Sequence, residues 1–140
     1  MTSWPEIEAV IEAAPRAGQM PQARAAELLA AGEAILEGWL GAQGESPTAS
    51  EREGFRLLAL QRQGAAGDPS FNACRESCRE LVYHHNMIVA DETSEVTQRA
   101  LKLMPFVARH LYLFVTGKLT TQGLGDFCCA AKPVRAADTV

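Results

Sequence analysis

The sequence predicts an all-α protein: a helical bundle of four main helices plus a short N-terminal helix, arranged up-and-down with neighbouring helices antiparallel. Apolar side chains recur at spacings of three and four residues along most of the chain up to Thr116. No strand-like alternation of apolar and polar residues is present, and neither is an internal repeat of about 20–50 residues. The connectors between the predicted helices are short, which makes consecutive helices neighbours of opposite direction. A globin-like crossing of the helices is the alternative architecture.

The first two helices are marked by their start and stop residues. Ser3 and Glu6 form a capping-box pattern, and the helix that follows them ends before Pro15. Pro21 opens a longer helix, whose stop is marked by Gly41 and Gly44. One face of this longer helix carries small or apolar residues at three-four spacing, namely Ala25, Leu28, Gly32, Ile35 and Trp39. We expect this face to lie in the core.

The third and fourth helices are predicted between residues 47 and 91. A second capping pattern in residues 47–51 predicts a helix that fades at Gly64. Asp68 and Pro69 then fit the N-cap and the first position of a helix of about six turns. The apolar stripe of that helix consists of Phe71, Cys74, Cys78, Leu81, His85 and Ile88. Both cysteines and His85 therefore point toward whatever packs against this helix.

The fifth helix is predicted from about Ser94 to Thr116, with Gly117 as its C-cap and a kink at Pro105. Its expected stripe is Val96, Ala100, Leu103, Val107, His110 and Phe114. The helices together define a single helical domain over residues 1–120, while residues 121–140 lack periodicity and indicate a loosely ordered C-terminal tail. A shared core is expected to contain Trp39, Leu81, Val107, Leu111 and Phe114.

Composition excludes several functional classes. The net charge of −4 and the aromatic content of 6% argue against nucleic acid as a partner, since there is neither general attraction to phosphates nor a base-stacking platform. No apolar run approaches the roughly 20 residues that a membrane span needs, so no membrane association is expected. The N-terminus is acidic and does not resemble a secretion signal, which favours the cytoplasm. In that compartment the four cysteines should be free thiols or metal ligands.

The pair Cys74 and Cys78 is the strongest chemical motif in the chain. Side chains four residues apart on a helix lie about 5–6 Å from each other, so two thiolates can bind one soft metal ion. If the fourth and fifth helices form an antiparallel hairpin, His110 comes level with Cys74, and His85 is a possible fourth ligand. These ligands favour zinc or copper. The alternative is that both cysteines are small buried core residues, and the roles of Cys128 and Cys129 stay open.

Motifs of known enzyme classes are absent from the sequence, so an enzyme is not favoured. There is no Gly-rich phosphate loop, no nucleophile elbow and no HExxH pattern. Charge is divided unevenly, because residues 1–95 carry seven basic and fifteen acidic side chains, whereas residues 96–140 carry six basic and two acidic ones. Arg99, Lys102 and Arg109 on the fifth helix form a possible docking strip for an acidic partner. We therefore expect an accessory protein that acts by binding another protein or its own copy. The alternative is a metal-binding or thiol-redox protein.

Overall fold

The computed structural model describes residues 2–124, and in this part of the chain it is an all-α helical bundle without β-strands. The predicted fold class is confirmed. The helical elements are α1 (Trp4–Glu12), α2 (Pro21–Ala42), α3 (Arg56–Gly67), the short 3-10 helix η1 (Pro69–Cys74), α4 (Arg75–Ala90) and α5 (Glu95–Thr121). No helix among the described residues is both long enough and apolar enough to cross a membrane. The tail predicted over residues 121–140 lies, from residue 125 onward, outside the described residues.

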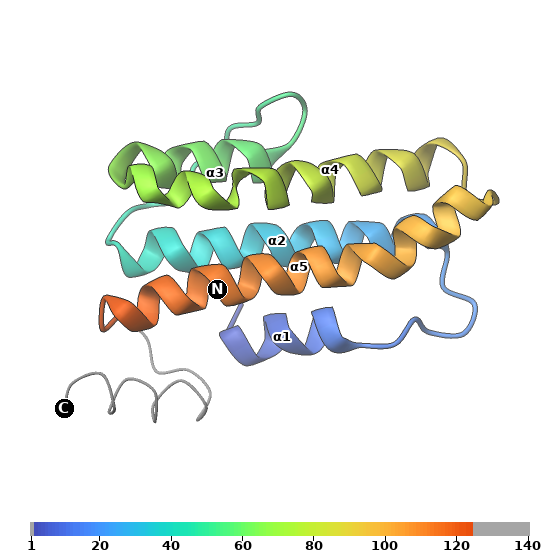
Figure 1. Ribbon diagram of the computed structural model, residues 1–140, viewed down its shortest axis with the longest axis horizontal. Coiled ribbons are helices and arrows are strands. Elements are labelled where there is room, and N and C mark those ends of the chain that lie inside the picture. The colour runs from blue at the N-terminus through green and yellow to red at the C-terminus, as the bar shows by residue number, and fades with distance from the viewer. Residues whose placement is uncertain (1, 125–140) are drawn as a thin grey trace.

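Helix α2 lies at the centre of the bundle, because it packs against each of the four other α-helices. Figure 1 shows α3 and α4 on one side of the pair formed by α2 and α5, and α1 on the other side. The apolar side chains of α2 therefore face several directions, and its buried residues include Leu28, Ile35, Leu36 and Trp39. This central position explains why the apolar surface of α2 is wider than a single stripe.

Helix α3 departs from the up-and-down arrangement, because it runs parallel to α2. A Cβ atom added to Gly32 would lie 3.2 Å from the side chain of Leu57, near the start of α3. A Cβ atom added to Gly64, near the end of α3, would lie 3.3 Å from the ring of Trp39. The connector over residues 43–55 thus carries the chain back along the bundle before α3 begins. The pairs α1/α2, α3/α4 and α4/α5 are antiparallel, as predicted (Figure 1).

The second capping pattern does not begin a helix at residues 47–51. Instead, the hydroxyl of Thr48 accepts a hydrogen bond from the backbone N–H of Ser50, which stabilises a local turn. Two left-handed residues follow, Glu53 with φ 55° and Gly54 with φ 84°, and this conformation is incompatible with a continuous helix. Helix α3 therefore starts only at Arg56.

Helices α1, α2 and α5 begin where predicted, whereas Asp68 and Pro69 begin the 3-10 helix η1, so that α4 starts only at Arg75 and is shorter than the predicted six turns. The end of α5 lies later than predicted. The side chains of Ser3, Asp68 and Ser94 cap α1, η1 and α5, respectively. Helix α5 continues through Gly117 to Thr121, and Gly123, with φ 72°, ends it. The N–H of Leu124 donates to the carbonyl of Leu119 at 2.8 Å, as in a Schellman cap.

The core is one cluster that draws on all five α-helices and η1. Of the five residues predicted to share it, Trp39, Leu81 and Leu111 are fully buried, and Val107 and Phe114 pack against it partly buried. The buried stripe of α5, however, is Thr97, Ala100, Met104, Ala108, Leu111, Val115 and Leu119. The helix is therefore rotated relative to the prediction, and Val96 and Leu103 are exposed.

Candidate functional site

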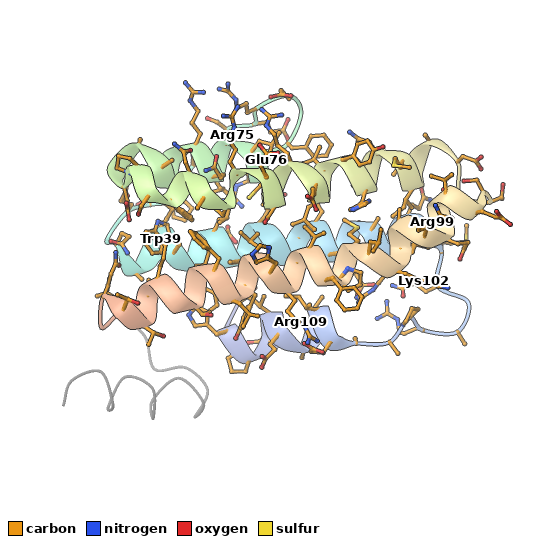
Figure 2. The ribbon with its side chains drawn as sticks, viewed as in Figure 1. Trp39, Arg75, Glu76, Arg99, Lys102 and Arg109 are labelled. Atoms are coloured by element: carbon orange, nitrogen blue, oxygen red, sulfur yellow. The ribbon has the colours of Figure 1, made fainter. Side chains whose placement is uncertain are left out.

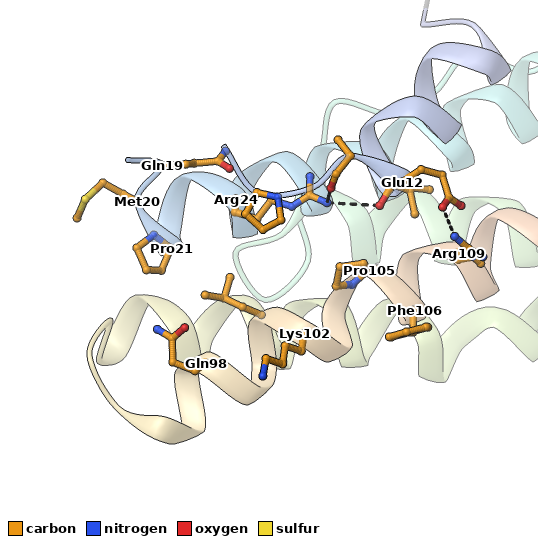
Figure 3. A pocket seen from close by; sticks show the side chains of 14 residues that line it. Glu12, Gln19, Met20, Pro21, Arg24, Gln98, Lys102, Pro105, Phe106 and Arg109 are labelled. Atoms are coloured by element: carbon orange, nitrogen blue, oxygen red, sulfur yellow. Dashed lines mark hydrogen bonds and ion pairs between the residues drawn. The ribbon is translucent and has the colours of Figure 1, made fainter. Parts of the chain in front are cut away.

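A groove lies between α5 and the segment that joins α1 to α2. Its volume is about 770 Å³, and Figure 3 shows its two walls. Most of the lining side chains are apolar, including Ile11, Ala13, Pro15, Met20, Pro21, Leu101, Pro105 and Phe106. The polar residues that complete the lining are the amides Gln19 and Gln98 and the charged residues Glu12, Arg24, Lys102 and Arg109. We call this feature the α1–α5 groove.

The wall formed by α1 and its connector is held in place by Arg24 of α2, which is only 5% exposed. Its guanidinium donates hydrogen bonds to the carbonyls of Val10 at 3.0 Å, Ile11 at 3.4 Å and Ala13 at 3.0 Å. These are carbonyls at the C-terminus of α1, where a cation is favourable. Burial lowers the pKa of Arg24, although Glu27 opposes this effect. Arg24 thus gives the connector its shape.

The opposite wall is a face of α5 that the bundle leaves open. Pro105 and Phe106 lie on it, and Phe106 is 69% exposed although it is among the largest apolar side chains of the chain. Arg109 forms an ion pair across the end of the groove with Glu12 of α1, drawn as a dashed line in Figure 3. Lys102 lies along the same wall and makes no ion pair among residues 2–124.

The exposed apolar surface continues along α5 beyond the groove. Its members, spaced by seven, three and seven residues, are Val96, Leu103, Phe106 and Leu113. Arg99, Lys102 and Arg109, the predicted basic strip, are labelled along α5 in Figure 2 and are exposed as well. An apolar stripe bordered by cations is therefore present on α5.

The structure brings Cys74 and Cys78 together inside the core. Both thiols are free and buried, and the Sγ atom of Cys74 donates to the carbonyl of Phe71 at 3.0 Å. The hydrogen bond with Cys74, together with burial, raises the pKa of Cys78 well above its ordinary value. Cys78 is therefore a protonated thiol at neutral pH, which is the unreactive form of the side chain.

The two predicted histidine ligands do not join the thiols. His110 is exposed, because α5 packs through its Met104–Leu111 side rather than through the predicted stripe. His85 is half-buried, with its ring edge-to-face to Phe55, the residue before α3, at 5.6 Å between centroids. Within residues 2–124 no three His, Cys, Asp or Glu side chains are grouped so that they could hold a metal ion. Cys128 and Cys129 lie outside the described residues.

Sequence reasoning identified the basic strip but missed the groove. The available signals were the proline-flanked connector from Pro15 to Pro21 and the surplus of apolar residues on α5, which exceed what one buried stripe can hold. Neither signal shows how α1 packs against the bundle, and so neither predicts the α1–α5 groove. Comparison of the chain with family models, with curated proteins and with solved structures found no match.

Proposed function

We propose that this protein is a cytoplasmic accessory protein without catalytic activity, and that it binds an acidic amphipathic helix of a partner protein in the α1–α5 groove. The observation that supports the proposal is the combination of a groove of about 770 Å³, an exposed Phe106 at its edge, and Arg99 and Lys102 beside it, which make no ion pair among residues 2–124. Helix-in-groove recognition uses such a surface, with apolar anchors spaced by three, four and seven residues on the bound helix.

The apolar part of the surface supplies the driving force for binding. Phe106 and Leu103 are exposed on one helix and extend the apolar lining of the groove. Covering a side chain of this size stabilises a complex by about 1.5–3 kcal/mol. Contiguous exposed apolar surface of this kind marks interaction sites on other proteins.

The charged part of the surface selects the chemistry of the partner. Arg99 and Lys102 are exposed and have no acidic partner among residues 2–124, whereas Arg109 is already paired with Glu12. A bound helix with glutamates beside its apolar stripe would meet these cations. Complementary charge raises the association rate and disfavours basic partners.

The test uses a synthetic amphipathic peptide with leucines at three-four spacing and glutamates on its flanks. We expect the peptide to bind the full chain in a fluorescence anisotropy titration, and Phe106→Ala to weaken binding about tenfold or more, as for an aromatic anchor. The matched control is Tyr83→Ala on α4, because Tyr83 is 60% exposed but lies outside the groove. A scrambled peptide and a peptide with lysines in place of glutamates should bind more weakly.

Three results would contradict the proposal. The first is equal weakening by Phe106→Ala and Tyr83→Ala, and the second is stronger binding of the lysine peptide. The third is a dimer in sedimentation equilibrium that Phe106→Ala dissociates, because the groove would then be an interface between two copies of this chain.

The Cys74–Cys78 pair is a second candidate, for zinc or copper binding or for thiol redox chemistry. It is favoured by the position of the two buried, free thiols four residues apart, close enough for Cys74 to raise the pKa of Cys78. Two thiolates are half of the ligand set of a tetrahedral zinc site. Metal analysis of the native chain beside Cys74→Ser tests this candidate, and unchanged metal content in the variant would exclude the pair as the ligand.

A further inference from the structure

A second hollow, of about 380 Å³, lies on α3 and α4, away from the α1–α5 groove. Four arginines from three segments converge on it: Arg52 from the α2–α3 connector, Arg62 from α3, and Arg75 and Arg79 from α4. We call it the arginine pocket. Figure 2 shows Arg75 beside this connector, on the side of the bundle opposite to Arg109. Four of the thirteen Lys and Arg residues of an acidic chain are thus gathered at one place.

Few carboxylates compensate this charge. Glu53 lies 2.9 Å from a guanidinium nitrogen of Arg79 and 4.0 Å from Arg52, and these arginines lower its pKa. Glu76 is close enough to Arg79 to influence it electrostatically, but it does not line the pocket. Arg62 and Arg75 make no ion pair within the part of the chain that the structure describes.

The pocket has a fixed polar wall as well as charge. Gln61 is 6% exposed, and its amide donates to the carbonyl of Phe71 at 3.4 Å and to Oδ1 of Asn72 at 3.3 Å. Asn72 also lines the pocket, and accepting from Gln61 orients its amide oxygen toward α3. The Arg79 guanidinium is oriented in the same way by Glu53, and Arg52 lies 4.0 Å from that carboxylate. Among residues 2–124, Arg62 and Arg75 are therefore the pocket arginines that make no ion pair and can bind a ligand.

We propose that the arginine pocket binds the phosphate group of a small phosphorylated molecule. The planar guanidinium offers several N–H donors in a fork that matches phosphate oxygens, and a phosphate with nearly two negative charges can accept from more than one arginine at once. A single carboxylate carries half this charge. The volume of about 380 Å³ is at the lower end of the range for small-molecule sites, so the ligand is compact.

The experiment titrates the full chain with pyrophosphate at low ionic strength, by calorimetry and by NMR of the arginine Nε–H signals. We expect pyrophosphate to bind with a Kd below about 1 mM. The signals of Arg62 and Arg75 should shift most. The double variant Arg62→Gln/Arg75→Gln should weaken binding at least about tenfold, because two charge-assisted contacts are lost.

The matched control is Arg99→Gln/Lys102→Gln, which removes the same charge from exposed positions on α5. Binding to this control should stay close to that of the wild-type chain, and circular dichroism should show both variants folded. Equal weakening in the two double variants would mean general charge attraction and would overturn the proposal. Absence of binding at about 1 mM pyrophosphate would overturn it as well. Tighter binding of a phosphoserine peptide than of pyrophosphate would assign the pocket to a phosphorylated protein and overturn the small-molecule assignment.

Discussion

At the residue scale, the orientation of single side chains on α5 decides which chemistry the protein presents. Leu111 is fully buried, whereas Leu113, two positions further on, is 59% exposed. His110 lies on the exposed side with Leu113, whereas the thiols of Cys74 and Cys78 are buried, and the three residues do not form a group that could hold a metal ion. The same rotation brings Phe106 to the edge of the groove.

Truncation of Leu111 and Leu113 tests this orientation directly. Leu111→Ala should lower the free energy of unfolding by about 2–5 kcal/mol, because it removes buried apolar atoms and leaves a cavity. The matched control, Leu113→Ala on the same helix, should change the free energy by less than about 0.5 kcal/mol. Urea denaturation measures both, and similar losses in the two variants would mean that the buried side of α5 is misassigned.

His84 supplies a pH-dependent contribution to stability. Its Nδ1 atom is buried without a hydrogen-bond partner among the described residues, and burial lowers its pKa from the ordinary value of 6.5, opposed by Glu80. The unfolded chain therefore binds a proton at this histidine more readily than the folded chain does. The stability that the neutral form of His84 contributes is fully present above pH 6.5, the pKa in the unfolded chain. This contribution is lost as the pH falls through the lowered pKa of the folded chain.

Variants separate this contribution from that of other groups. We expect His84→Leu to lose less stability than the wild-type chain between about pH 7.5 and about pH 5.5, in urea denaturation at each pH. The matched control is Leu113→Ala, which alters an exposed side chain that does not titrate and should keep the wild-type dependence of stability on pH. Burial raises the pKa of Glu33, so this carboxyl stabilises the folded chain as the pH falls, opposite to the effect of His84. Because Glu33 is present in the wild-type chain and in both variants, its effect cancels in the comparison. An unchanged dependence in His84→Leu would refute the assignment.

At the element scale, close contacts at glycines determine how the helices approach α2. A Cβ atom at Gly32 would lie 3.1 Å from Leu81, so α4 packs directly on the backbone of α2 there. At Gly38 the added atom would lie 2.6 Å from the ring of Trp4, which is how α1 docks. Docking of α1 in turn creates one wall of the α1–α5 groove.

Two glycine substitutions isolate the contact between α1 and α2. Gly38→Ala and Gly117→Ala both gain helix propensity, but only at Gly38 does the new methyl group meet another side chain, since nothing lies within 4 Å of Gly117. We expect Gly38→Ala to be less stable than Gly117→Ala by about 1–3 kcal/mol, the usual effect of overpacking. Thermal and urea denaturation compare the two, and equal stability would mean that Trp4 does not pack on Gly38.

At the scale of the whole molecule, one core joins all the helices, including the short α1. Ile7 and Ile11 of α1 belong to the same buried cluster as the long helices. The ring of Trp4 also lies edge-to-face to Tyr112 of α5, with 5.9 Å between centroids. Because of these contacts, we expect α1 to unfold together with the other helices as one cooperative unit.

Unfolding of the whole chain should therefore be a single transition. The chain has two tryptophans, so Trp4→Phe leaves Trp39 as the reporter of the core and Trp39→Phe leaves Trp4 as the reporter of α1. In each variant we expect the fluorescence and circular dichroism transitions in urea to coincide. An earlier fluorescence change in Trp39→Phe would show that α1 detaches first, and that the groove opens before the bundle unfolds.

The sequence by itself determined the all-α class, the existence of five α-helices and the caps at Ser3, Asp68 and Ser94, because these features depend on contacts within about one helical turn. It also showed the basic strip on the last helix. Only the tertiary structure decided which side of α5 is buried. That helix is apolar on more than one side, and packing against its neighbouring helices determines which of these sides lies in the core. The direction of α3 and the convergence of Arg62 with Arg75 likewise depend on packing between distant segments, which no local pattern encodes.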